Sequence, residues 1–311
     1  MNPEMQKPRL VIIVGATAVG KTDLALALAQ NLGGEIISAD SMQVYRHMDI
    51  GTAKPSTDQR ARVRHHLLDV ANPDEPFNAA RFVETATPVI RALREKGTPI
   101  LVVGGTGLYI RALLGGLFPG PAADEDLRRR YRAQQEAQGP DYLYGELQRI
   151  DELAARRINP HDTVRIIRAL EVMALTGRSI VEKQAQHGFS DRPYDYIEFG
   201  LQMDRRCLYE RIERRTREMM NSGLVAEVER LLGMGYGEDL RPMQTMGYKH
   251  IIAYIRGRIT LDEAIRLTAR DTRRYAKRQG TWFGTDAEIQ WHSSKEFDRL
   301  YELTRRFLAH G

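Results

Sequence analysis

The chain has 311 residues, of which 42% are hydrophobic and 28% charged, a composition typical of a globular protein with ample core. Its single cysteine, Cys207, excludes an internal disulfide and a cysteine-based zinc site, and it fits a reducing compartment. No apolar run is long enough to span a bilayer, and no apolar signal-peptide segment precedes the first predicted strand, so we expect a cytoplasmic protein.

The net charge is +5 and the isoelectric point is about 9.3. Arginine is concentrated in three segments, residues 127–132, 205–217 and 267–278. If these segments are helices whose basic faces lie side by side, they form one positive surface for a polyanion larger than a nucleotide. They fit solvated helix faces equally well, so charge alone leaves both interpretations open.

The first predicted elements are a strand over residues 10–14 and a helix over residues 23–32, joined by Gly15-Ala16-Thr17-Ala18-Val19-Gly20-Lys21-Thr22. This is the pattern G-x-x-x-x-G-K-[ST] in the strand–loop–helix context of a phosphate-binding loop. Backbone N–H groups and the helix N-terminus attract an anion, Lys21 adds a charge, and the Thr22 hydroxyl can hold Mg²⁺. The pattern predicts a di- or triphosphate ligand and leaves open which of its bonds breaks.

Strands and helices alternate up to residue 114. The next predicted elements are strands over residues 35–39, 65–70 and 99–103 and helices over residues 78–96 and 107–114. Asn78 is a suitable N-cap and Gly97 a suitable stop for the longer helix, and Pro88 predicts a kink inside it. Such alternation is typical of a parallel sheet flanked by helices.

From residue 124 to about 186 only helical patterns occur, one of which is expected to start at Asn159-Pro160 and to end at Gly177. The remaining predicted elements are strands over residues 194–203 and 288–291 and helices over residues 205–223, 224–232, 261–283 and 295–310. We therefore predict an α/β fold, a P-loop NTPase-like parallel sheet flanked by helices, with an all-helical insertion domain. The expected domains are the first part of the core at residues 1–119, the insertion at 120–193, and the second part of the core with C-terminal helices at 194–311.

Polar residues follow two of the predicted strands at the edge of the sheet where the phosphate loop also opens. Asp40 could hold Mg²⁺ through water or act as a general base, although it could also simply cap a turn. Gly104-Gly105-Thr106-Gly107 allows close backbone approach and offers the Thr106 hydroxyl at the same edge. It is not the G-x-G-x-x-G fingerprint, so no dinucleotide is implied.

Several arginines on predicted helices are candidates for phosphate contacts. Arg165 and Arg168 share a helix face beside an expected buried stripe of Val164, Ile167 and Leu170. One arginine of residues 211–217, if directed at the phosphate loop, would bind an anionic leaving group. Cations mixed with aromatics near the end of the longest helix suit a nucleic acid, although the aromatics fit a core equally well: Arg273, Arg274, Tyr275, Lys277, Arg278 and Trp282.

With these motifs in order along nearly its whole length, the chain resembles the tRNA dimethylallyltransferases. The phosphate loop is common to many families, whereas the Asp-Ser-x-Gln-x-Tyr-Arg run followed by Gly-Thr-Ala-Lys-Pro is specific. The matching segments besides the phosphate loop are Asp40-Ser41-Met42-Gln43-Val44-Tyr45-Arg46, Gly51-Thr52-Ala53-Lys54-Pro55, Gly104-Gly105-Thr106-Gly107-Leu108-Tyr109, residues 165–171, Met246-Gly247-Tyr248-Lys249 and residues 275–279 with Thr281-Trp282. The resemblance implies transfer of a dimethylallyl group from its diphosphate to the exocyclic amine of the adenine at tRNA position 37.

By the same resemblance, the catalytic residues are Asp40 as general base, Thr106 beside it, and Arg215. Thr17, Lys21, Thr22 and Arg215 would hold the diphosphate, with Mg²⁺ as the ion and Thr22 as its protein ligand. The implied tRNA contacts are Asp40, Ser41, Met42, Gln43, Thr106, Arg128, Val164, Arg165, Ile166, Ile167, Arg168, Gln244, Thr245, Met246, Gly247, Tyr248, Lys249, Arg274, Lys277, Arg278, Gln279 and Thr281.

The chain departs from the family pattern at three positions. Ala16 stands where the family usually has proline, which removes a rigid turn but no ligand. Gly280 and Gly284 replace bulkier or basic residues, and a glycine inside a helix costs about 1 kcal/mol against alanine. We expect a monomer that binds tRNA through its anticodon stem-loop.

Two other functions fit part of the pattern. A small-molecule or nucleoside kinase would use the phosphate loop for ATP but would leave the basic C-terminal helix unexplained. An NTP-binding RNA adaptor would use the loop only to sense nucleotide. The ligand distinguishes them, because ATP with Mg²⁺ should stabilise a kinase or an adaptor against heat, whereas dimethylallyl diphosphate with tRNA should stabilise a transferase.

Overall fold

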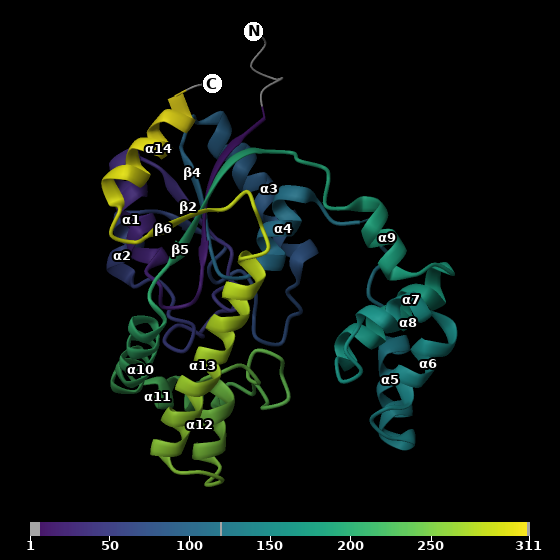
Figure 1. Ribbon diagram of the computed structural model, residues 1–311. Coiled ribbons are helices and arrows are strands. Elements are labelled where there is room, and N and C mark those ends of the chain that lie inside the picture. The colour runs from purple at the N-terminus through teal and green to yellow at the C-terminus, as the bar shows by residue number, and fades with distance from the viewer. Residues whose placement is uncertain (1–6, 119, 310–311) are drawn as a thin grey trace. The chain divides into compact units, whose positions relative to one another are not determined.

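The computed structural model describes residues 7–118 and 120–309, and within these ranges the strands form one parallel sheet (Figure 1). They are β1 (Arg9–Gly15), β2 (Glu35–Ser38), β3 (His65–His66), β4 (Ile100–Val103), β5 (Asp195–Gln202) and β6 (Gln290–Ser293). Their order across the sheet is β3-β2-β4-β1-β5-β6. β1 is central, since Val11 pairs with Leu101 of β4 on one side and with Ile197 of β5 on the other. The predicted α/β fold with a parallel sheet is confirmed.

Helices cover both faces of the sheet. In Figure 1, α1 (Lys21–Leu32), α2 (Thr57–Arg62) and α14 (Phe297–Ala309) lie on one side, and α3 (Ala79–Glu95) and α4 (Gly107–Gly115) lie on the other. The apolar side of α1 packs with β1 and β5 in one core, where Ile13, Leu28 and Phe199 are fully buried. This burial stabilises the layers and leaves the ends of the strands to the loops.

Four further helices lie beyond the carboxyl ends of the strands, at the edge where the phosphate loop opens (Figure 1). They are α10 (Arg205–Asn221), α11 (Leu224–Gly233), α12 (Tyr248–Ile255) and α13 (Leu261–Phe283). α10 and α12 both pack against α13, and the last turns of α13 reach back to the sheet. α13 therefore connects the C-terminal helices to the loops of the core.

The residues Leu114–Arg192 form a compact unit separate from the rest of the chain. Its helices are α5 (Glu125–Gln138), α6 (Tyr142–Ile150), α7 (Glu152–Arg157), α8 (Thr163–Thr176) and α9 (Ile180–His187). Leu147, Ile166 and Leu170 are among the buried residues of its own core. We call this unit the helical unit and the rest of the chain the sheet unit.

Several predicted elements differ from the structure. The strand expected over residues 65–70 ends at His66, because Leu67 and Asp69 adopt φ values of 61° and 57°, which a strand does not allow. α8 begins at Thr163 and not at Asn159-Pro160, since the Asp162 side chain accepts the N–H of Arg165 as N-cap. The short helices α2 and α12 were not predicted.

Other predictions of elements are confirmed. Asn78 caps α3 by accepting the N–H of Arg81. α3 is one helix through Pro88, and the kink expected there stays a prediction. α13 has the predicted bounds and runs through Gly280 without interruption. α14 covers most of the closing helix, whose last predicted residue lies outside the described ranges. No helix within those ranges combines the length and the apolar run that crossing a membrane requires.

Candidate active site

The phosphate loop lies between β1 and α1, and Gly20 occupies the N-cap of α1 with φ 107°. Because glycine has no side chain that could cap the helix, the first N–H groups of α1 are left for an anion. Lys21 folds back over the loop, and its Nζ donates to the carbonyl oxygens of Gly15 and Ala16 at 2.9 and 2.8 Å. Burial lowers the pKa of the Lys21 ammonium to about 8, against the opposing charge of Asp40.

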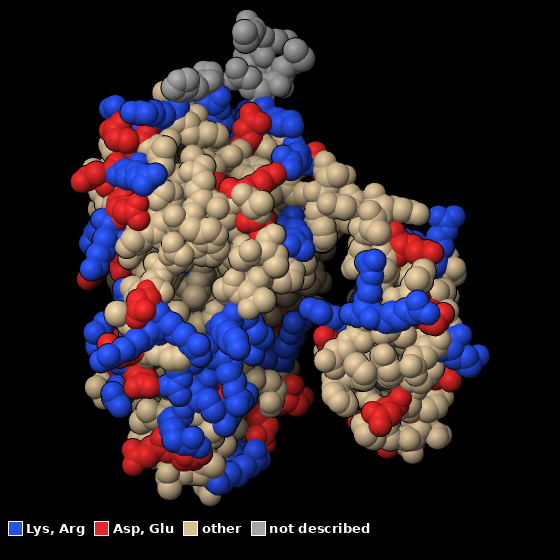
Figure 2. Space-filling view, viewed as in Figure 1, with Lys and Arg blue, Asp and Glu red and all other residues tan. Residues whose placement is uncertain are grey.

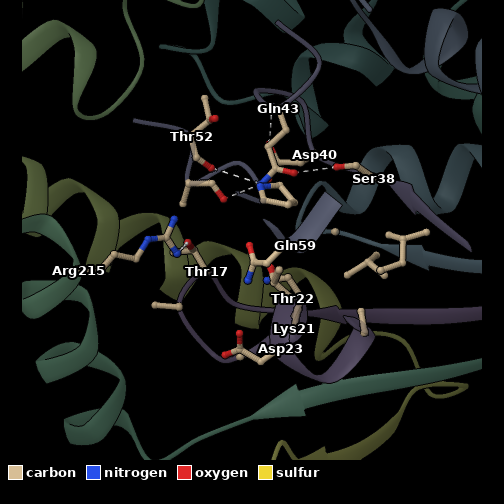
Figure 3. A pocket seen from close by; sticks show the side chains of 18 of the residues that line it. Thr17, Lys21, Thr22, Asp23, Ser38, Asp40, Gln43, Thr52, Gln59 and Arg215 are labelled. Atoms are coloured by element: carbon tan, nitrogen blue, oxygen red, sulfur yellow. Dashed lines mark hydrogen bonds between the residues drawn. The ribbon is translucent and has the colours of Figure 1, made fainter. Parts of the chain in front are cut away.

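A polar cavity of about 330 Å³ adjoins the loop, and Thr17, Lys21, Thr22 and Arg215 line it (Figure 3). Arg215 of α10 donates from a guanidinium nitrogen to the Thr17 hydroxyl at 3.4 Å. Burial lowers the pKa of Arg215, and the charge of Asp40 opposes this, but a guanidinium stays protonated in either case. The structure thus identifies Arg215 as an arginine of residues 211–217 that reaches the loop, with Arg211 also lining the cavity.

A second, more apolar cavity of about 430 Å³ adjoins the first. It lies between the sheet edge and the C-terminal helices, and aromatic side chains contribute to its wall: Tyr45, Phe77, Tyr109, Tyr248 and Tyr275. Both cavities are lined by Thr17, Ala18, Asp40, Thr52 and Arg215. Ligand sites in proteins commonly combine such an apolar wall with a few polar groups. These aromatics were not predicted as cavity residues, because aromatic residues at such spacing fit a hydrophobic core equally well.

Asp40 follows β2 and lies at the junction of the two cavities. One of its carboxylate oxygens accepts the N–H groups of Met42 and Gln43 at 2.8 and 3.3 Å. The turn-capping role and the site role considered for Asp40 are therefore compatible, since the cap fixes the direction of the carboxylate. Thr106 lies nearby, and its hydroxyl accepts the N–H of Ser41 at 3.0 Å.

The turn after Asp40 is hydrogen-bonded to the loop of residues 49–53, which is itself hydrogen-bonded to the C-terminal helices. Gln43 donates to the carbonyl oxygens of Thr52 and Ala53 and accepts the Ser38 hydroxyl (Figure 3). That loop is anchored in turn by Glu227 of α11, whose carboxylate accepts the N–H groups of Asp49, Ile50 and Gly51 and the hydroxyl of Tyr248. Glu227 is 2% exposed. Neither this anchor nor the internal hydrogen bonds of Gln43 were predicted.

Several predicted tRNA contacts have side chains that the fold itself uses. Tyr248 is 1% exposed and donates to Glu227, and Gln279 is 6% exposed and bonds to two loops. Ile166 is buried in the core of the helical unit. The expected buried stripe of α8 was wrong at Val164, which is 74% exposed because it lies in the first turn, ahead of the packed face.

Exposed cations lie on α13 and form what we call its cationic face. They are Arg274, Lys277 and Arg278, with the Thr281 hydroxyl beside them. Figure 2 shows Lys and Arg side chains gathered over the part of the sheet unit that α10 to α13 form. Of the predicted segment 244–249, Gln244 is exposed, Thr245, Met246 and Gly247 line the apolar cavity, and Lys249 forms an ion pair with Asp271 at 3.0 Å.

In the helical unit, Arg128 and Arg168 meet at one carboxylate. Glu171 has a fully buried side chain and accepts hydrogen bonds from both guanidinium groups and from the N–H of Asp124. Burial alone would raise the pKa of the Glu171 carboxyl, but the bonds from the two arginines outweigh burial and hold the pKa below its usual range. Arg165, by contrast, keeps 69% of its side chain exposed.

Replacing Glu171 by leucine is expected to lower the free energy of unfolding of the helical unit by about 3 kcal/mol. This is the lower end of the range for a broken buried pair, because both arginines keep about a quarter of their side chains exposed. Amide hydrogen exchange in α5 and α8 of the full chain should become faster. The same stabilisation should be lost in acid, as the pH falls through the depressed pKa of Glu171.

The matched control is Glu125→Gln, which removes an exposed carboxylate 3.2 Å from Arg128. It should cost less than about 1 kcal/mol. Equal exchange rates in Glu171→Leu and the control would contradict the role assigned to Glu171.

Within the described ranges, no cluster of three or more histidine, cysteine, aspartate or glutamate residues is placed to hold a metal ion. The Thr22 hydroxyl and the Asp40 carboxylate both line the polar cavity. This sparse set fits Mg²⁺, which keeps several waters and is usually held by one or two protein oxygens together with substrate phosphates.

Comparisons with known proteins agree with one another. The model of the IPP transferase family matches residues 43–286. The chain is 56% identical to tRNA dimethylallyltransferase 2 of Syntrophus aciditrophicus and 46% identical to the tRNA dimethylallyltransferase of Geobacter sulfurreducens, each over 99% of both chains. A solved structure, the full-length tRNA isopentenylpyrophosphate transferase of Bacillus halodurans, matches with a TM-score of 0.72 and 41% identity over 97% of both chains.

Proposed function

Since the chain belongs to the IPP transferase family, that of the tRNA dimethylallyltransferases, we propose that it moves the dimethylallyl group of dimethylallyl diphosphate to the exocyclic amine of the adenine at tRNA position 37. The observation that supports this most directly is the place of Asp40 between a polar cavity at the phosphate loop and an apolar cavity. The polar cavity suits a diphosphate, and the apolar cavity suits a flat base and a short hydrocarbon.

The leaving group is the diphosphate, which gains negative charge as the allylic carbon–oxygen bond breaks. Lys21, Arg215 and the first N–H groups of α1 border the polar cavity that it would occupy, and they would stabilise that charge. Mg²⁺ held at Thr22 would neutralise further charge on the phosphates. Because these groups are fixed before the bond breaks, they act more strongly on the departing diphosphate than on the substrate.

The acceptor is the adenine, which must leave its base stack to reach the junction of the cavities. Its exocyclic nitrogen forms the new bond to the allylic carbon, and the amine proton passes to the Asp40 carboxylate. The products are isopentenyladenosine in the tRNA and free diphosphate. Thr106, whose hydroxyl borders the apolar cavity, would orient the reacting groups beside Asp40.

The tRNA would bind along the cationic face of α13 and through exposed residues of the helical unit, including Arg165. One chain lines both cavities, which supports a monomer as the active form. We propose that it acts in the cytoplasm, where its substrate tRNA is found.

In the decisive experiment, the protein is incubated with Mg²⁺, dimethylallyl diphosphate and unmodified tRNA, and the digested tRNA is then analysed by mass spectrometry. We expect adenine that carries the added dimethylallyl mass. Modification of competent tRNA in the presence of ATP but not of dimethylallyl diphosphate, or no added mass at all, would overturn the proposal. The family match already favours the transferase over a kinase.

Replacing Lys277 and Arg278 by alanine is expected to weaken tRNA binding and its dependence on salt. Each lost phosphate contact should reduce the slope of log affinity against log salt by roughly 0.7–0.9. Filter binding at salt concentrations from about 50 to about 300 mM measures this slope. The control Arg91→Ala removes an exposed arginine of α3 and should leave the slope unchanged. Equal slopes for the two variants would exclude this face of α13.

A further inference from the structure

We propose that Gln279 is a positioning residue of the reaction, whose side-chain amide fixes the phosphate loop and the loop Gly104–Gly107 relative to each other. The resemblance implied that Gln279 contacts tRNA, but its side chain is 6% exposed. The inference rests on the proposed function, since it concerns how the diphosphate end and the acceptor end of the site are held together.

The amide of Gln279 bonds to both loops. Its Oε1 accepts the N–H of Thr17 at 2.8 Å, and its Nε2 donates to the carbonyl oxygen of Gly105 at 2.9 Å. Both interactions need this one orientation of the amide, because a rotated amide would set N–H against N–H and oxygen against oxygen. A Cβ at position 105 would lie 2.1 Å from Nε2 of Gln279, so any larger residue there would displace the amide.

Two neighbours on the same face of α13 contact the second loop as well. Tyr275, four residues before Gln279, lines the apolar cavity together with Thr106, and Trp282, three residues after Gln279, packs over Gly107. A Cβ at Gly107 would lie 2.0 Å from the Trp282 ring nitrogen. Burial, with the charge of Asp40 adding to it, raises the pKa of Tyr275 to about 12, so the phenol stays protonated. This face of α13 is therefore built onto the loops, with Gln279 at its centre.

The two loops carry opposite ends of the reaction. Thr17 belongs to the phosphate loop, and its hydroxyl lies 3.4 Å from the Arg215 guanidinium. Thr106 belongs to the other loop and accepts the N–H of Ser41, directly after Asp40. The separation of these loops thus sets the distance between the bound diphosphate and the base that takes the proton. Errors of about 1 Å in such a distance can cost up to about 10²-fold in rate.

The test compares Gln279→Leu, which loses both hydrogen bonds at similar size, with Gln279→Glu. At saturating tRNA, we expect kcat of Gln279→Leu to fall by about 10- to 100-fold while the dissociation constant for tRNA changes by less than about twofold. A glutamate keeps the acceptor for Thr17 but donates to Gly105 only when protonated. Burial should raise the pKa of the introduced carboxyl, so that it becomes protonated as the pH falls from about 8 to about 6. The activity of Gln279→Glu relative to wild type should therefore recover over this range.

The matched control, Gln290→Leu, removes an exposed glutamine of β6. Thermal unfolding of all variants identifies any that fail to fold. Weakened tRNA binding with unchanged kcat at saturating tRNA would assign Gln279 to recognition and overturn the inference, as would wild-type kcat in Gln279→Leu. No recovery of Gln279→Glu at low pH would also count against it. An inactive wild type, by contrast, would refute the proposed function itself.

Discussion

Replacing Asp40 by asparagine is expected to lower kcat for tRNA prenylation by roughly 10²–10⁴-fold, the usual contribution of a general base. Asparagine keeps the oxygen that accepts the N–H groups of Met42 and Gln43, so the turn should stay intact. It cannot take up the amine proton at neutral pH. Single-turnover assays with saturating substrates measure the chemical step directly.

The affinity of Asp40→Asn for tRNA should stay within about threefold of wild type, because one hydrogen-bond acceptor is replaced by another of equal size. The control is Asp74→Asn, an exposed aspartate outside both cavities. If binding collapses while the rate with saturating tRNA remains high, Asp40 acts in recognition and not as the base.

The affinity for dimethylallyl diphosphate is expected to fall about tenfold for each pH unit above about 8. The pKa of Lys21 lies near 8 in the free protein, and a bound anion raises it. Binding above pH 8 must therefore restore a proton that the free protein has lost, so affinity decreases as pH rises. The last ionisation of a phosphate lies near pH 6, which keeps the charge of the ligand constant over this range.

Calorimetric titration of the protein with dimethylallyl diphosphate, repeated at intervals of about one pH unit from pH 7 to 10, tests this pH dependence. The other groups at the cavity keep their charge there, since Arg215 remains a cation and the pKa of Tyr275 is about 12. Lys21→Met should bind weakly at pH 7 and show no decline above pH 8. A wild-type profile that is flat up to pH 10 would contradict the prediction.

The sequence predicted best what depends on residues close together in the chain. The phosphate loop, the N-cap at Asn78 and the helix from Leu261 to Phe283 are each set by a local pattern, and all of them are found. The rule that polar residues after parallel strands meet at one edge correctly brought Asp40 near Thr106. Short helices such as α12 were not predicted, because one or two helical turns carry too little hydrophobic periodicity.

Local sequence patterns did not predict the long-range contacts that hold the site together. Gln279 and Thr17 are 262 residues apart, and Glu227 and Ile50 are 177 apart. A glutamine on a basic helix gives no local sign that its amide will be buried between two loops. The same applies to Tyr248, whose place in a motif suggested a ligand contact but whose hydroxyl donates to Glu227.

The central strand has a consequence for how the protein is made. β1 pairs along its full length with β5, whose first residue comes 186 positions later in the register Arg9 with Asp195. The nascent chain must therefore keep one side of an apolar strand unpaired until β5 has been synthesised, a condition that favours slow folding and chaperone contact. Because the Thr17 N–H donates to Gln279, the phosphate loop reaches its final hydrogen bonding only after residue 279 has been added to the nascent chain.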